Sequence, residues 1–203
     1  NGYRTALIGK WHLGYLQKHH PMNFGFQKFV GFKSGNVDYQ SHRNRYGDVD
    51  WWDGLEMKNM PGYTTTLLTT LSEDYIKENK DKPFCLYIAH AAPHSPMQGP
   101  NEKAIRTEAT LEGDKNSDRP NKEIYKDMVE ELDWSVGRIL ETLKKYKLGK
   151  NTFVVFFSDN GPVINNGGST GGYRGAKGAP WEGGHRVPGI CYMPGTVKGG
   201  TMC

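Results

Sequence analysis

The first residues that could take part in a chemical reaction are a lysine and a histidine near the start of the sequence. Lys10 and His12 stand two residues apart in a segment expected to be extended, so their side chains should point the same way. An ammonium group can hold an oxygen of sulfate or phosphate, and a neutral imidazole can carry a proton. The plainer alternative is a surface lysine beside a hydrogen-bonded histidine, and the pair alone favours it.

Two further segments each carry one basic side chain in a setting that suits catalysis. His94 lies in a loop between Pro93 and Pro96, and the prolines restrict the backbone. A general acid must be held in a fixed position, so this setting suits one. Lys177 lies in a glycine-rich stretch where a cation can meet an anion. A loop histidine satisfied by the backbone and a solvated lysine are the plainer alternatives.

Asp159 and Asn160 place a carboxylate and an amide oxygen directly after an apolar run. Such hard oxygen ligands suit Ca²⁺ or Mg²⁺. Asp-Asn-Gly is also a common turn sequence, so a plain Asx turn is the competing interpretation. Taken alone, the dipeptide favours the turn.

Hydrophobic patterning predicts the elements that must bring these segments together. Apolar residues recur at three- or four-residue steps over 64–79 and 122–147, which indicates two helices. Short apolar runs at 84–89 and 152–157 indicate buried strands, the second covered on both faces. Helices alternating with such strands favour an α/β layered fold, in which ligands collect at the carboxyl ends of the strands. The histidine loop and the Asp-Asn pair each follow a strand, so we expect them at one edge of the sheet.

The overall composition is that of a globular protein and excludes several other classes. The net charge of +4 is mild and the basic residues are scattered, which argues against a nucleic-acid-binding face. No apolar run approaches the roughly 20 residues that cross a bilayer. The 3 cysteines lack the close spacing of a zinc site, and Cys85 and Cys191 lie in strand-like runs where buried thiols are expected.

The order of these motifs resembles that of the type I sulfatases over nearly the whole chain. The lysine–histidine segment is similar to the family's second signature, and the proline-flanked histidine is similar to its catalytic-histidine loop. The Asp-Asn pair looks like its metal-binding strand end, and the last stretch resembles its late lysine loop. In chain order the matching segments are Gly2-Tyr3-Arg4-Thr5-Ala6-Leu7-Ile8-Gly9-Lys10-Trp11-His12, Pro93-His94-Ser95-Pro96, Phe157-Ser158-Asp159-Asn160-Gly161, and Gly175-Ala176-Lys177-Gly178 followed by Trp181-Glu182-Gly183-Gly184-His185-Arg186-Val187-Pro188.

The resemblance implies an alkaline-phosphatase-like layered α/β fold, with a central mainly parallel or mixed sheet flanked by helices, and a sulfuric ester hydrolase activity. It implies that both lysines bind the sulfate oxygens. His94 would also contact the substrate and donate a proton to the leaving alcohol, and His12 would contact the nucleophile. The residues with implied catalytic roles are therefore Lys10, His12, His94 and Lys177.

The resemblance further implies one Ca²⁺ ion, with Asp159 and Asn160 among its ligands, and a formylglycine nucleophile made from a Cys or Ser in a Cys-x-Pro-Ser-Arg or related stretch. Residues 1–203 contain neither that stretch nor the family's early pair of metal-binding aspartates. We therefore expect 1–203 to be part of a single catalytic domain, truncated at the amino end and also at the carboxyl end. The nucleophile and the remaining metal ligands are then expected upstream, and the fragment alone is expected to be inactive.

The partners expected from the resemblance are a sulfated carbohydrate or another sulfate ester and the formylglycine-generating machinery, with no nucleic acid and no membrane span. The expected location is periplasmic, secreted or lysosome-like. Two alternatives stay open: a phosphate or phosphonate ester hydrolase of the same superfamily, and a non-catalytic homologue that binds sulfated glycans.

Residues 34–53 are the stretch from which a carbohydrate subsite is expected. Arginine can pair bidentately with a sulfate or a carboxylate, and aromatic faces can stack on sugar rings. The equally weighted alternative is an irregular loop that Trp51 and Trp52 pin as a small satellite core. The polar candidates are Asn and Asp side chains together with His42, Arg43 and Arg45.

Overall fold

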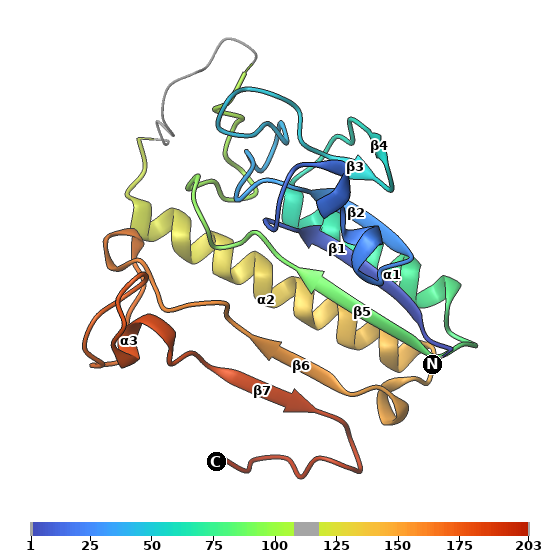
Figure 1. Cartoon of the computed structure of the whole chain (residues 1–203). Coiled ribbons are helices and arrows are strands. Elements are labelled where there is room, and N and C mark those ends of the chain that lie inside the picture. Colours follow the sequence, from blue (N-terminus) through green and yellow to red (C-terminus); the bar gives the residue numbers. More distant parts are fainter. Residues whose placement is uncertain (1, 108–117, 203) are drawn as a thin grey trace.

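The computed structural model describes residues 2–107 and 118–202 as a mixed α/β arrangement of two sheets and two long helices (Figure 1). Short 3₁₀ turns and a one-turn helix, α3, lie in the connections. In chain order the elements are β1 (Arg4–Lys10), η1 (Gln17–His19), η2 (Pro21–Phe24), β2 (Lys28–Phe32), β3 (Trp52–Asp53), β4 (Glu56–Met57), α1 (Thr64–Glu78), β5 (Phe84–Ala89), α2 (Asn121–Lys145), η3 (Gly149–Asn151), β6 (Val154–Phe157), η4 (Ile164–Asn166), α3 (Glu182–His185) and β7 (Gly189–Tyr192).

The larger sheet has five strands in the order β4-β3-β2-β1-β5. β1 pairs in parallel with both β2 and β5, while β3 and β4 add an antiparallel edge. β1 is thus an interior strand of the sheet, and its Ala6, Leu7 and Ile8 are fully buried. β6 and β7 form a separate antiparallel pair. The predicted α/β layered fold with a mixed sheet is confirmed.

The helices α1 and α2 pack against each other and share one hydrophobic core with the larger sheet. This core includes Ala6 and Ile8 from β1, Leu68 from α1, and Ile124 and Met128 from α2. Fully burying an aliphatic side chain of this size typically stabilises a fold by about 1.5–3 kcal/mol. The two helices predicted from periodicity are confirmed, with ends within one or two residues of those expected.

The strand expected to be covered on both faces is β6, and that expectation is wrong for this chain. Val155 is 48% exposed and Phe157 is 59% exposed, and Ile190 on the paired strand β7 is 58% exposed. The apolar pattern is typical of a buried strand, but Val155 and Phe157 border an open cavity and stay accessible to solvent. The outer edge of β6 also pairs with no strand within 2–107 and 118–202.

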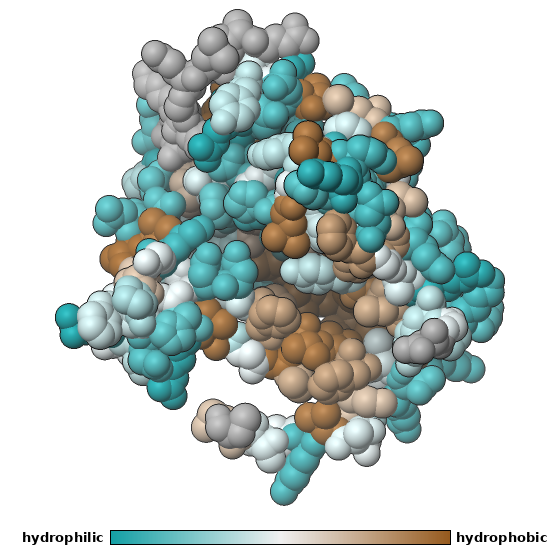
Figure 2. All heavy atoms as spheres, in the orientation of Figure 1, coloured by the Kyte–Doolittle hydropathy of each residue, from teal (hydrophilic) through white to brown (hydrophobic). Residues whose placement is uncertain are grey.

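The strand β5 is covered on one face, where Phe84, Leu86 and Ile88 pack against the core, so the prediction of a buried strand holds for that face only. Tyr87 is 49% exposed, and β5 is an edge strand of the larger sheet in the described part of the chain. Cys85 and Cys191, expected as buried thiols, are exposed free cysteines on β5 and β7 for the same reason. Figure 2 shows hydrophobic side chains gathered around a hollow over β5 and β6. β5 and β6 run in the same direction in Figure 1, so their carboxyl ends lie on the same side of the molecule.

The loop of residues 34–53 is anchored in the main core rather than in a satellite core. Trp51 is fully buried, and its ring lies 4.4 Å from that of His42, which is also buried. The prediction of a small satellite core is therefore wrong, as is His42 as a sugar ligand. Trp52 lies nearer the surface, with the Lys33 ammonium 3.4 Å from its ring centroid.

A buried carboxylate, Asp38, fastens this loop to the segment that follows residue 100. Its two oxygens accept backbone N–H bonds of 2.7–2.9 Å from Gln40, Ser41, Ile105 and Arg106. Burial by itself raises the pKa of Asp38, but the four backbone hydrogen bonds together outweigh burial and lower the pKa. The loop therefore has a fixed base from which its tip projects.

Among the described residues, no helix combines the length and the apolar character needed to cross a membrane.

Candidate functional site

Lys10 is the last residue of β1, so it lies at the carboxyl end of the parallel strands, where the candidate site is found. The preceding residue, Gly9, has a φ of +123°, and a Cβ there would lie 2.1 Å from the carbonyl oxygen of Ala89 on β5. Only glycine allows the two strands to approach this closely. Gly9 therefore holds Lys10 beside the loop that leaves β5 and carries His94.

His12 lies just beyond β1 in a left-handed backbone conformation, with a φ of 54°. Its N–H donates to the carbonyl of Lys33 at 3.2 Å, and its ring packs on Gly35, where a Cβ would lie 2.5 Å from Nε2. The segment is thus not extended at His12, so strand alternation is not what aligns it with Lys10. Both side chains nevertheless line the same cavity.

His94 lies in the loop after β5, half-buried and held by its own neighbour. Its Nδ1 lies 2.8 Å from the carbonyl oxygen of Ser95, and the His94 carbonyl accepts the Tyr39 hydroxyl at 2.9 Å. Because a carbonyl oxygen only accepts, Nδ1 carries a proton in this arrangement. Nε2 is therefore the nitrogen that can take up or release a proton toward a ligand.

The loops that carry Asp159, Asn160 and Lys177 are joined by backbone hydrogen bonds. The Lys177 N–H donates to the carbonyl of Pro162 at 3.0 Å, and the Gly161 N–H donates to the carbonyl of Gly184 at 2.8 Å. These bonds tie the glycine-rich stretch to the turn that ends β6. A lysine and a carboxylate 18 positions apart in sequence (177 minus 159) are thereby brought to one place.

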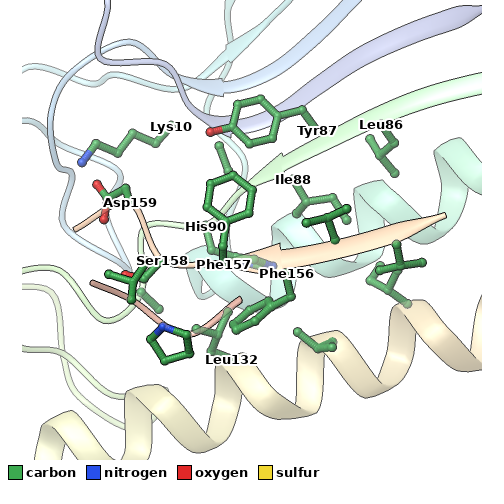
Figure 3. A pocket seen from close by; sticks show the side chains of 18 of the residues that line it. Lys10, Leu86, Tyr87, Ile88, His90, Leu132, Phe156, Phe157, Ser158 and Asp159 are labelled. Carbon is green, nitrogen blue, oxygen red and sulfur yellow. The ribbon is translucent and has the colours of Figure 1, made fainter. Parts of the chain in front are cut away.

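One cavity of about 1860 Å³ is lined by all six residues singled out from the sequence: Lys10, His12, His94, Asp159, Asn160 and Lys177. In Figure 3 the Lys10 ammonium and the Asp159 carboxylate face each other at one end of this cavity. The rest of the cavity is the apolar space between β5, β6 and α2, where Tyr87 and Phe157 project. β5 and β6 belong to different sheets, but the loops at their carboxyl ends meet here.

The charges at this end of the cavity influence one another. Burial lowers the pKa of Lys10, Asp159 opposes that shift, and Lys177 adds to it. Burial also lowers the pKa of His12, and Lys10, Lys177 and then Arg45 lower it further. These effects favour uncharged imidazoles beside two ammonium groups, an arrangement suited to an anion.

Asp159 and Asn160 offer the oxygen atoms that a hard cation prefers, but the two residues are too few to complete its coordination. Within the described residues the Asp159 carboxylate makes no hydrogen bond or ion pair, while Asn160 uses its Nδ2 to donate to Gly161 at 3.0 Å and keeps its amide oxygen available. Ca²⁺ takes 6–8 oxygen ligands. No cluster of three or more His, Cys, Asp or Glu side chains suited to a metal occurs among residues 2–107 and 118–202. These two residues would therefore need further ligands from elsewhere.

Sequence reasoning did not single out Tyr15 and Tyr46, and it named Arg45 only as one of several residues in a loop. These three residues line a second cavity that shares His12 and His94 with the first. The available signal was the pair of arginines in the loop, Arg43 and Arg45, of which the described part of the fold uses only one. Arg43 donates to the carbonyl of Gly47, whereas Arg45 is exposed.

Comparison with known proteins gives concordant results along the chain. Residues 1–201 match the family model described as Sulfatase. Mouse arylsulfatase J is 33% identical over 100% of this chain and 34% of its own length, and dog N-acetylgalactosamine-6-sulfatase is 33% identical over 99% of the chain and 39% of its own length. The chain thus spans between a third and two fifths of the length of these curated relatives.

Solved structures with the same fold include Ps i-CgsB, at a TM-score of 0.80 and 28% identity, with 97% of this chain and 46% of that chain covered. The complex of Ps i-CgsB with k-i-k-neocarrahexaose superposes at a TM-score of 0.79 with 29% identity, and covers 96% of this chain and 45% of that chain. The likeness therefore extends over almost all of the sequence and under half of each solved chain.

Proposed function

Because this chain belongs to the sulfatase family, we propose that the whole protein hydrolyses sulfate esters, and that 1–203 is part of one catalytic domain. The observation that carries the proposal is that two lysines, two histidines and an Asp-Asn pair line a single cavity, where Lys10, Lys177 and Asp159 act electrostatically on both histidines. Sulfated carbohydrates are the proposed substrate class, since relatives are named for a sulfated amino sugar and for a complex with a neocarrahexaose.

Lys10 and Lys177 are proposed to hold the sulfate group. Transfer of a sulfuryl group spreads negative charge over its non-bridging oxygens, and cations placed at those oxygens stabilise the transition state more than the ground state. Both lysines line the cavity, and each acts electrostatically on His94 and His12. A tetrahedral anion between the lysines would therefore meet positive charge on two sides.

His94 is proposed as the acid that protonates the leaving alcohol oxygen, and His12 as the histidine that contacts the nucleophile. With Nδ1 of His94 bonded to Ser95, Nε2 is the atom that would deliver the proton. The nucleophile is proposed to be a formylglycine in a part of the whole protein outside this chain, made there by formylglycine-generating machinery. The predicted periplasmic, secreted or lysosome-like location stays a prediction.

Family membership implies a metal cofactor, and we propose Ca²⁺, with Asp159 and Asn160 supplying two of its oxygen ligands. When bound, such an ion would neutralise part of the negative charge on the sulfate. The Asp159 carboxylate and the Asn160 amide oxygen, which have no hydrogen-bond partner in the part of the chain that the structure describes, support this assignment. The other ligands are proposed to come from the rest of the protein.

A calcium titration of the whole protein tests this assignment. Asp159→Ala should weaken Ca²⁺ binding by on the order of a hundredfold, because a charged ligand is lost and only a neutral amide is left on this side of the ion. Isothermal titration calorimetry measures the affinity directly, without reference to turnover. Asp133→Ala, which removes an exposed carboxylate from α2, is the matched control and should bind as the parent does. Equal affinities in the two variants would remove Asp159 from the metal site.

The activity is tested by expressing the whole protein with formylglycine-generating machinery and offering it matched sulfate and phosphate esters of one sugar. Ion chromatography should detect inorganic sulfate, with phosphate released at least about tenfold more slowly, because the lysine pair and the proposed single-ion site leave a phosphate dianion less well neutralised. Protein made without the machinery should release neither. Faster phosphate release would favour the phosphatase alternative, and glycan binding without any turnover would favour the non-catalytic one.

A further inference from the structure

A second cavity, of about 240 Å³, opens beside the candidate site. At roughly 30 Å³ per water molecule it has room for about eight waters, enough for one sugar ring but not for several. It shares the side chains of His12 and His94 with the larger cavity, so a ligand in one lies next to a ligand in the other. The remaining lining residues are Tyr15, Ser34, Gly35, Asn36, Asn44, Arg45 and Tyr46.

Arg45 is the arginine of this cavity, and its guanidinium stabilises no other described part of the fold. Its side chain is exposed and makes no hydrogen bond or ion pair with any residue that the structure describes. By contrast, Arg106 is buried and donates to the amide oxygen of Asn36 at 3.1 Å. The charge of Arg45 is close enough to act on both His12 and Tyr15. A guanidinium in this position is available for an anion that enters from solvent.

The tip that carries Arg45 is closed on itself. The side-chain oxygen of Asn44 accepts the N–H groups of Tyr46 at 2.8 Å and Asp48 at 3.2 Å, and the Gly47 N–H donates to the carbonyl of Asn44 at 3.1 Å. Below the tip, Asp38 and Trp51 hold the loop in the core. Because the backbone is held, Arg45 loses less conformational freedom on binding than an arginine in an open loop would lose.

Two tyrosines complete the surroundings of Arg45. Tyr15 is 57% exposed and Tyr46 is 65% exposed, although both line the cavity. The backbone of Tyr15 is held by Lys33, whose ammonium donates to the Tyr15 carbonyl at 3.4 Å. Each tyrosine offers an apolar ring face and a hydroxyl, which suits the C–H faces and hydroxyl groups of a sugar.

We propose that this cavity is a subsite for a second anionic group of the substrate, a carboxylate or a further sulfate on the sugar unit next to the ester that is cleaved. Arg45 binds that anion, and Tyr15 and Tyr46 contact the sugar ring. The proposal rests on the proposed sulfatase function, because it takes His12 and His94 as the shared wall between the cleaved sulfate and its neighbour. It makes Arg45 a specificity residue for doubly charged glycans.

The test compares the whole protein with its Arg45→Gln variant on three oligosaccharides of one length. The first carries only the scissile sulfate, the second adds a uronate next to it, and the third adds a second sulfate there. The ratio of kcat/KM for a doubly charged substrate to that for the singly charged one should fall about ten- to a hundredfold, because a charge-assisted bidentate pair is lost. Lys150→Gln, which removes an exposed charge on η3, is the control and should leave the ratio unchanged.

Comparing the three substrates shows whether the subsite binds a carboxylate, a sulfate or both. A fall confined to the uronate identifies a carboxylate subsite, a fall confined to the disulfated sugar identifies a sulfate subsite, and a fall on both identifies a general anion subsite. An unchanged ratio, or an equal loss on all three substrates, overturns the proposal. If the parent protein turns over none of them, calorimetric affinities for the same three sugars decide the subsite, since the loss of affinity should still follow the second anion.

Discussion

Replacing His94 with alanine in the whole protein should lower kcat for an alkyl sulfate by on the order of a hundredfold or more. An alkoxide is a poor leaving group, and in the proposed mechanism it takes a proton from Nε2 of His94. A nitrophenolate leaves without that help, and the same variant should lose much less activity on 4-nitrophenyl sulfate. The measurement is a comparison of kcat for the two esters in parent and variant.

The pH profile gives an independent check on the same residue. Burial lowers the pKa of His94, and the nearby charges of Lys177 and Lys10 lower it further, against the Ser95 hydrogen bond and Asp159, which raise it. The proton-donating form exists below this pKa, so kcat/KM of the parent should fall as pH rises through a value below the ordinary 6.5 of histidine. His94→Ala should lack this fall. The control is His185→Ala, which removes an exposed imidazole 3.5 Å from Glu182 and should keep both the rate and the pH profile of the parent. In the comparison of the two esters, equal losses of kcat in His94→Ala would contradict the role of His94 as an acid.

Removing either lysine of the proposed sulfate site should also lower kcat/KM by on the order of a hundredfold or more. Lys10→Ala and Lys177→Ala each take one positive charge from the oxygens of the transferring group, where charge builds up in the transition state. Because both ammonium groups are proposed to act on one anion, the double variant should lose less than the product of the two single losses. Competitive inhibition by inorganic sulfate should weaken in each variant, which measures anion binding apart from turnover.

A lysine at the opposite end of the sheet supplies the matched control. Lys28 begins β2, and its ammonium lies 3.5 Å from Glu78 in an exposed ion pair, a type worth about 0–1 kcal/mol. Lys28→Ala should therefore leave turnover and sulfate inhibition close to the parent values. Near-normal turnover in Lys10→Ala and Lys177→Ala alike would remove the anion site from the proposed mechanism.

The parts of this molecule that could be predicted are those that depend on local pattern. The periodic apolar stripe of α2 and the continuous apolar run of β5 are clear in the sequence. The structure confirms the predicted extents of both elements to within one or two residues. The convergence of Lys10 with His94 follows from a general property of parallel strands, whose carboxyl ends meet at one edge. None of this needed knowledge of which atoms fill the space between the elements.

What could not be predicted is how exposed those elements are and how the loops close. An apolar strand such as β6 indicates that something covers it, but the pattern does not say which part of a protein does so. The sequence makes His42 a candidate for a sugar site and predicts Trp51 in a small satellite core, yet packing buries both side chains and places Trp51 in the main core. Arg45 could be told from Arg43 and Arg106 only once their hydrogen-bond partners were known.

Within residues 2–107 and 118–202, the outer edges of β5 and β6 pair with no strand and have apolar faces beside them, which has a practical consequence for handling this polypeptide. Backbone N–H and C=O groups left open along a strand are templates for a strand from another molecule. Produced by itself at high concentration, the 203-residue chain should recruit further copies of itself at these edges. An oligomer observed with the isolated chain would then reflect pairing at these edges, and would say little about the subunit number of the whole protein.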